Sequence, residues 1–364
     1  MKKILIMLVI LPAFFGCAWA EEVDGQALEI FESGKMEQGL KEHELEIIGS
    51  VEPAQFDAFP ALSRLWNAFL SEIQNQLREN LGFAVELFGL ILFSALAGAL
   101  CGDEKIRAAV EILTFCFAAF LLAGNVDSLV SQTLETIYRL SDYSRTALPV
   151  TFTAAAAGGA VSSSAVRYAA ACLAMDVMMS LSQKAVIPLV YDALALGLAN
   201  ILFPNPILSA MEALSKWAAK TIMTWAALAF TAYLSLSSVV STSVDAAAIK
   251  AMRSVVSGVL PVVGGMLSDA SAAVLSAASV IRSCTGAVGL IAVSVVCAGP
   301  LALLCVKRFL FKAVAAAAEA VQNPRLQKLF SCVGSAAGML MGLLGCNAMM
   351  LFLSFTAAMK AVSA

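Results

Sequence analysis

The sequence predicts an all-α polytopic membrane protein, and three observations lead to this fold class. Of its 364 residues, 60% are hydrophobic and only 13% are charged, whereas a soluble domain is about 45–50% apolar and about 25% charged. The mean hydropathy is +0.86. Apolar runs of membrane-spanning length follow residue 80. We therefore expect a signal peptide over residues 1–20, a short acidic extracytoplasmic helical region over 21–80 and a multi-helix transmembrane domain over 81–361.

The N-terminus has the order of a secretory signal peptide. Lys2 and Lys3 form a basic start, residues 4–15 form an apolar stretch, and a small-x-small tripeptide ends at Ala20. We expect cleavage between Ala20 and Glu21. The apolar stretch is shorter than the about 20 residues of a membrane span, although an uncleaved signal anchor is an alternative.

Residues 21–80 are strongly acidic, with thirteen acidic and four basic side chains and a net charge of −9. A signal peptide places this region outside the cytoplasm, as would the alternative of a lipoprotein signal at Cys17. Apolar residues between 62 and 77 recur close to the 3.6-residue period of a helix. The region either leans on the membrane domain or a partner as a short helix, or forms a partly ordered acidic linker.

Two clear spans open the membrane domain, over residues 81–100 and 108–126, with Lys105 and Arg107 in the polar turn between them. Basic residues favour the cytoplasmic side of a membrane, so we expect this turn inside the cell. The charged stretch at 127–146 then lies outside, and its spacing predicts a separate amphipathic helix along the membrane interface.

The later apolar runs are shorter and are interrupted by proline, glycine or charged residues. This pattern favours broken or re-entrant helices, which are tolerated at membrane depth where protein buries them. A second basic cluster over residues 307–328 is also expected in the cytoplasm. An odd number of crossings must then connect it to the stretch at 127–146.

The spacing of prolines suggests two internal repeats, over residues 148–206 and 260–324. Repeats of this kind build many transporters. The matched features are Leu-Pro-Val at 148–150 and 260–262, a following Gly-Gly pair at 158–159 and 264–265, Pro-Leu at 188–189 and 300–301, and Asn-Pro at 205–206 and 323–324.

Ionisable residues within the apolar tract are the next candidates for functional positions, because each needs a partner or a watery cavity in a membrane. Such charges either line a polar path for cargo, form structural ion pairs or sit at the interface, and Asp269 could pair with an intramembrane arginine. The charged candidates are Glu86, Glu111, Arg167, Asp176, Asp192, Asp269 and Arg282. The polar or packing positions that we single out are Pro149, Arg167, Pro261, Gly264, Gly265, Asp269, Arg282 and Pro300.

Composition also excludes several functions. A single histidine, His43, rules out a His-based metal site or a Ser-His-Asp triad in the apolar tract. A net charge of −3 offers no basic field for nucleic acid. An intramembrane aspartyl protease would need two facing acids, such as Asp176 and Asp192, and no trusted motif surrounds them. We predict no catalytic, cofactor-binding or metal-binding residue and no cofactor.

Three short motifs follow one another between residues 254 and 300: Pro-Val-Val-Gly at 261–264, Ser-Asp-Ala at 268–270, and Gly-x-x-Gly-Leu at 286–290. Together they resemble the most characteristic stretch of the stage III sporulation protein AE family. The segment at 148–162 resembles the family's other marked segment. The order of signal peptide, polar region and polytopic domain is similar as well.

The resemblance implies a non-enzymatic membrane subunit of a sporulation-specific, secretion-like channel complex that joins mother cell and forespore. It also implies residence in the mother-cell membrane around the forespore and a need for the protein in late forespore gene expression. The implied partners are other stage III proteins, including a secretion-type ATPase and ring-forming extracytoplasmic subunits, together with membrane lipid but no nucleic acid. The alternative is a stand-alone permease for a small solute.

Overall fold

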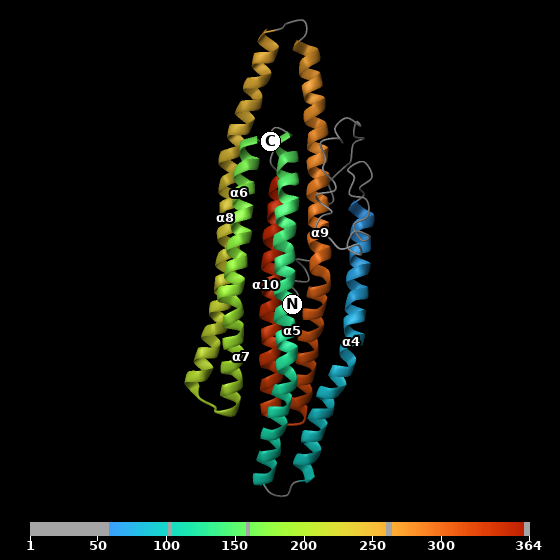
Figure 1. Ribbon diagram of the computed structural model, residues 1–364, viewed down its shortest axis with the longest axis vertical. Coiled ribbons are helices and arrows are strands. Elements are labelled where there is room, and N and C mark those ends of the chain that lie inside the picture. Colours follow the sequence, from blue (N-terminus) through green and yellow to red (C-terminus); the bar gives the residue numbers. More distant parts are fainter. Residues whose placement is uncertain (1–57, 101–103, 158–160, 260–263, 360–364) are drawn as a thin grey trace.

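The computed structural model describes residues 58–100, 104–157, 161–259 and 264–359, with side chains from Ser63 onward except over 237–284 and at a few residues beside the helix ends. Every described segment of regular structure is helical, as the composition predicts (Figure 1). The elements are α4 (Ala58–Leu100), α5 (Glu104–Ala157), α6 (Val161–Leu181), the π-helix η2 (Ser182–Val186), α7 (Ile187–Leu202), α8 (Pro206–Val259), α9 (Gly264–Ala320) and α10 (Pro324–Met359).

The described helices run up and down a long bundle (Figure 1). α6, η2 and α7 follow one another as a single pass, so the described chain makes six passes. The helix ends that flank residues 101–103, 203–205 and 321–323 lie at the lower end in Figure 1. Three passes, made by α6–η2–α7, α8 and α9, lead from the upper end of α5 to the lower end of α9. This is an odd number, as expected between the charged stretch at 127–146 and the basic cluster at 307–328.

The structure corrects two expectations about helix continuity. Residues 127–146 are not a separate interfacial helix, because α5 continues from Glu104 to Ala157. Pro149 and Pro300 lie inside α5 and α9 and break neither helix. The π-helix at 182–186, just before Pro188, is the departure from α-helical geometry among the described residues.

The helix continues through Pro149, although proline lacks the backbone N–H that would bond to the Arg145 carbonyl one turn back. Two hydroxyl groups beyond the proline add local bonds to other carbonyls of the helix. The hydroxyl of Thr151 donates to the Ala147 carbonyl at 2.8 Å, and that of Thr153 donates to the Val150 carbonyl at 2.9 Å. Since α5 and α9 both continue through a proline, the proline pattern alone predicted more helix breaks than the structure has.

The core lies around α10, which contacts α5, α6, α7, α8 and α9 and occupies the centre of the bundle (Figure 1). Its buried residues recur from Leu326 to Ala358. Close packing against α9 depends on glycines, as in many membrane helix pairs. The buried ring of Phe355 fills the space over Gly289, and the Arg308 side chain lies over Gly338.

The outer surface is apolar. Large hydrophobic side chains are exposed along α4, α5 and α8, where a soluble protein would place charges. Five helical stretches in the described part of the chain are long and apolar enough to cross a membrane. The chain is therefore a multi-pass membrane protein. At 54 and 57 residues, α5 and α9 are each about 80 Å long and project beyond a hydrocarbon core of about 30 Å.

The two Asn-Pro motifs that suggested a repeat occupy similar places. Pro206 begins α8 and Pro324 begins α10, both at the lower end of the bundle. In each motif the asparagine Oδ1 accepts a backbone N–H from the first turn of the helix, from Ile207 in one case and from Leu326 in the other. The matched turns do not establish that the two segments superpose, so the repeat stays a prediction.

Candidate functional site

Two groups of polar contacts join the α4–α5 hairpin to the α9–α10 hairpin. The first has at its centre Lys307 of α9, which is only 7% exposed. The Lys307 Nζ donates to Oδ1 of Asn125 in α5 at 2.8 Å and lies 4.5 Å from the ring centroid of Phe83 in α4. Phe83 in turn meets the Phe311 ring edge-on. One cation thus bridges three helices.

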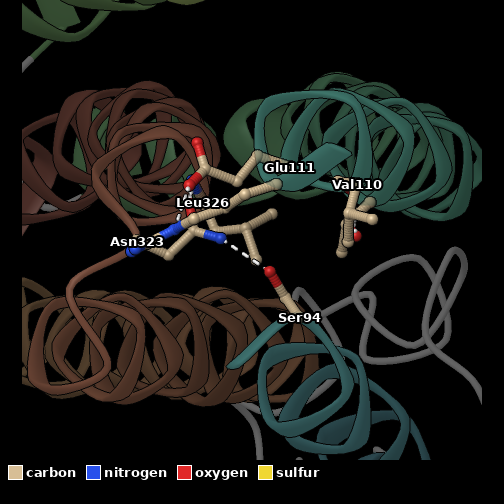
Figure 2. A network of polar contacts seen from close by, with 7 residues as sticks. Ser94, Val110, Glu111, Asn323 and Leu326 are labelled. Atoms are coloured by element: carbon tan, nitrogen blue, oxygen red, sulfur yellow. Dashed lines mark hydrogen bonds and ion pairs between the residues drawn. The ribbon is translucent and has the colours of Figure 1, made fainter. Parts of the chain in front are cut away.

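Asn323 is at the centre of the second group, in the turn between α9 and α10 (Figure 2). It is 5% exposed, and its Nδ2 donates to the Ser94 hydroxyl of α4 at 2.8 Å. Its Oδ1 accepts the Leu326 backbone N–H at 3.2 Å. The side chain therefore caps α10 and ties that helix to α4. We call Lys307, Asn125, Phe83, Asn323 and Ser94 the polar seam.

Glu111 of α5 lies beside the seam. Figure 2 shows its side chain extending toward the turn that carries Asn323 and Leu326. Its carboxylate also forms an ion pair with Arg107 one helical turn earlier, at 3.6 Å. The pair is partly exposed and so contributes little stability, but it neutralises a carboxylate that would be costly in lipid.

The seam sets how far the two hairpins are offset. Ser94 lies six residues before the end of α4, yet it bonds to the turn that begins α10. At 1.5 Å per residue, α4 continues about 9 Å past that contact. Figure 1 shows the α4–α5 hairpin extending below the α9–α10 turn. The arrangement can fix this register, and it lacks the nucleophile–base geometry of a hydrolytic site.

Arg167 of α6 bonds to the C-terminal end of α10. It is 2% exposed, and its Nη1 donates to the carbonyl of Ala357 at 2.7 Å. Ala357 lies in the last turn of α10, where carbonyls have no partner within the helix. A cation is also favoured at the negative end of the helix dipole. Arg167 therefore holds the C-terminal end of α10 against α6.

The acidic candidates do not converge. Asp176 of α6 pairs with Arg145 of α5 at 3.0 Å, and both side chains are more than half exposed. Asp192 lies sixteen residues further along the same pass, so its backbone is about 24 Å from that of Asp176 along the axis. The two aspartates do not face each other as an aspartyl protease requires. In the described residues, no group of three or more metal-ligating side chains gathers.

Most of the remaining predicted positions carry no side-chain description. Gly264, Gly265, Asp269 and Arg282 lie in α9, within the stretch whose side chains are not described. Thirteen residues of helix place the backbones of Asp269 and Arg282 about 20 Å apart, which argues against a pair between these two. Pro261, Ala20 and Glu21 lie outside the described residues altogether.

Sequence reasoning missed the polar seam. The charge pattern predicts that Lys307 belongs to a cytoplasmic basic cluster, whereas the structure buries its side chain between helices. Asn125 and Ser94 are isolated polar residues within two apolar spans, and no sequence motif singles them out. Their position in otherwise apolar helices was the available signal, since a buried polar group requires a partner.

Comparison with known proteins gives one result. A family model described as stage III sporulation protein AE matches residues 52–362. The match therefore includes the described bundle and the polar seam. No curated protein and no solved structure gives a match.

Proposed function

The chain belongs to the stage III sporulation protein AE family, and on that premise we propose that it is a non-enzymatic subunit of a sporulation-specific, secretion-like channel complex. The complex links mother cell and forespore, and this subunit resides in the mother-cell membrane around the forespore. Its role is to support late forespore gene expression. The observation that carries the proposal is the family match over residues 52–362, which spans the whole membrane bundle.

The position of α10 supports a scaffolding or lining role rather than a pore within one chain. Buried side chains from Leu326 to Ala358 fill the centre of the described bundle, and five neighbouring helices surround them. A conduit for cargo would therefore form between chains. Long helices that project beyond the bilayer also give the subunit surfaces for partners on both sides of the membrane.

The polar seam supports a structural role for the buried charges. Lys307 has neutral and aromatic partners rather than a carboxylate, and these partners tie the α4–α5 hairpin to α9. Arg167 has a backbone carbonyl as its partner at the other end of α10. Each cation holds neighbouring helices together, Lys307 between α5 and α9 and Arg167 between α6 and the end of α10. The proposed partners are a secretion-type ATPase and ring-forming extracytoplasmic subunits, with lipid around the bundle and no nucleic acid.

The test is deletion of the gene in a sporulating host, with a reporter for late forespore gene expression. We expect reporter activity to be lost after engulfment and to return when the full chain is supplied from the mother cell. Supply from the forespore alone should not restore it. Normal spores in the deletion strain would contradict the proposal. Solute transport by the purified chain alone in liposomes would favour a permease instead.

A further inference from the structure

The α4–α5 hairpin has an open groove on its outer side, between the two helices. The groove has a volume of about 940 Å³. We call it the hairpin groove. Its lining includes Glu86, Gly89 and Phe93 of α4 together with Leu113, Phe117 and Leu121 of α5.

The groove lies at membrane depth. Its residues belong to the two most apolar stretches of the hairpin, at 81–100 and 108–126. Phe93, Leu113 and Phe117 are 61%, 72% and 54% exposed. Within the described bundle these side chains have no cover, so lipid or another apolar body must cover them.

Glu86 is the unusual member of this lining. Its side chain is exposed in an apolar stretch, and it makes no hydrogen bond or ion pair with any residue that the structure describes. Lipid tails offer nothing to a carboxylate, so an ionisable group at this depth is costly and marks a site of interaction. The missing partner is a hydrogen-bond donor, and a cation satisfies the charge as well.

Glycines flank Glu86 on the same face of α4. Gly82, Glu86 and Gly89 are spaced by four and three residues, which places them in one stripe. Nothing lies within 4 Å of the Cβ position of either glycine, and the same holds for Gly124 on α5. Small residues let another helix backbone approach closely in a membrane. The open space therefore has the form that a packed helix needs.

We propose that the hairpin groove is the docking site for a transmembrane helix of a different membrane protein, and that this helix carries a lysine or arginine that pairs with Glu86. Charge decides between the candidate occupants. A lipid tail would leave the carboxylate without a partner. A symmetric second copy of this chain would bring two Glu86 carboxylates together, and like charges repel across an interface. A cationic helix satisfies both the apolar lining and the carboxylate.

The proposal rests on the proposed function in one respect, since a subunit of a membrane complex needs a lateral contact within the bilayer. The hairpin is suited to this contact because α9, α10 and α6 cover its inner side, where the polar seam also lies. Its other side carries the groove. Its tip extends beyond the α9–α10 turn, away from the other helices.

The test is photo-crosslinking in sporulating cells, with the full chain carrying a photoreactive residue at Phe117. The matched control position is Trp225 of α8, which is 68% exposed and lies outside the groove. We expect an adduct from position 117, and none from 225, with another membrane protein. Mass spectrometry should map the crosslink to an apolar helix of that protein that contains lysine or arginine.

Variants of the groove make the test specific. Glu86→Gln should lower the adduct yield by about three- to tenfold, the range expected for one polar contact between membrane helices. Glu86→Lys should abolish the adduct, and reversal of the mapped cation to glutamate should restore it. Gly89→Leu should block the groove while the protein still folds and reaches its normal amount in the membrane, because no atom lies within 4 Å of the Cβ position of that glycine.

Several outcomes would overturn the proposal: adducts with lipid only, adducts with a second copy of the chain, or an unchanged yield in Gly89→Leu. The two proposals fail in different ways. If the deletion strain makes normal spores while the mapped, Glu86-dependent adduct is present, the proposed function falls and the docking site stands. If deletion blocks forespore gene expression but no adduct forms at 117, the docking site falls alone.

Discussion

Gly289 has only a hydrogen as its side chain, and this leaves room for the buried ring of Phe355. An added Cβ there would lie 2.4–2.7 Å from three ring atoms of Phe355. Phe355 is fully buried and packs against Tyr143 at a centroid distance of 6.3 Å, so its ring cannot move aside freely. We expect Gly289→Ala to lower the free energy of unfolding by about 1–3 kcal/mol through overpacking. Thermal unfolding of the purified chain in detergent measures this.

The matched control is a glycine of α10. Apart from its own helix and chain neighbours, Gly345 has no atom within 4 Å of its Cβ position. Gly345→Ala should therefore leave stability unchanged or raise it slightly, because alanine has the higher helix propensity. Equal destabilisation by both substitutions would show that the loss comes from the backbone and not from contact with Phe355.

Lys307 and Asn125 form the second residue-scale test. Asn125→Leu removes the oxygen that accepts a hydrogen bond from the buried Lys307 ammonium at 2.8 Å. The free energy of unfolding should fall by about 1–3 kcal/mol, as for a buried donor left without its partner. Adding Lys307→Met to this variant also removes the buried ammonium, so that no donor is left without a partner. The double variant should then be more stable than the sum of the single losses predicts. Additive losses in a double-mutant cycle would contradict the contact.

At the scale of elements, the two Asn-Pro turns look alike in sequence but differ in burial. Asn323 is 5% exposed and bonds to Ser94 as well as capping α10. Asn205 is exposed and caps α8 through Ile207. We expect Asn323→Ala to cost more stability than Asn205→Ala, with about 1 kcal/mol for the cap in each case and a further loss for the bond between hairpins. A larger loss at Asn205 would argue against the polar seam.

The first hairpin was predictable because its turn is short and its spans are uniform. Spans expected at 81–100 and 108–126 correspond to a helix that ends at Leu100 and one that begins at Glu104. The charged stretch at 127–146 led to the wrong prediction of a separate interfacial helix, because its charged side chains face outward from α5. The buried side chains Ile137, Leu140 and Tyr143 continue the core contacts of α5 through the same stretch. An interfacial helix and the outer half of a long bundle helix give the same pattern.

The polar seam could not be predicted for a different reason. Asn125 and Lys307 are 182 residues apart in the chain, and periodicity identifies a face without identifying its partner. The positive-inside rule counts charges near span ends, so it assigned Lys307 to the cytoplasm from its neighbours Arg308 and Lys312. Only the packing of α4, α5 and α9 shows that this lysine lies inside the bundle.

At the scale of the whole molecule, the direction of α8 fixes the topology. Five described stretches meet a hydropathy criterion for membrane spans. The described part of α8, residues 206–236, includes Glu212, Lys216 and Lys220 and is not among them. Yet α8 runs antiparallel to α7 and α9 along the bundle (Figure 1). A chain with five crossings would have its two ends on opposite sides of the membrane, whereas six passes bring them to the same side.

We therefore expect reporter fusions near residue 60 and at the end of α10 to give the same result, outside the cytoplasm. Fusions near 104 and 315 should both read inside, because the lower ends of α5 and α9 lie together and carry the basic residues that favour the cytoplasm. A pair of fusions at 204 and 262 isolates α8 itself, since they should read inside and outside. Identical readings from this pair would remove α8 from the membrane and reverse the predicted side of α9.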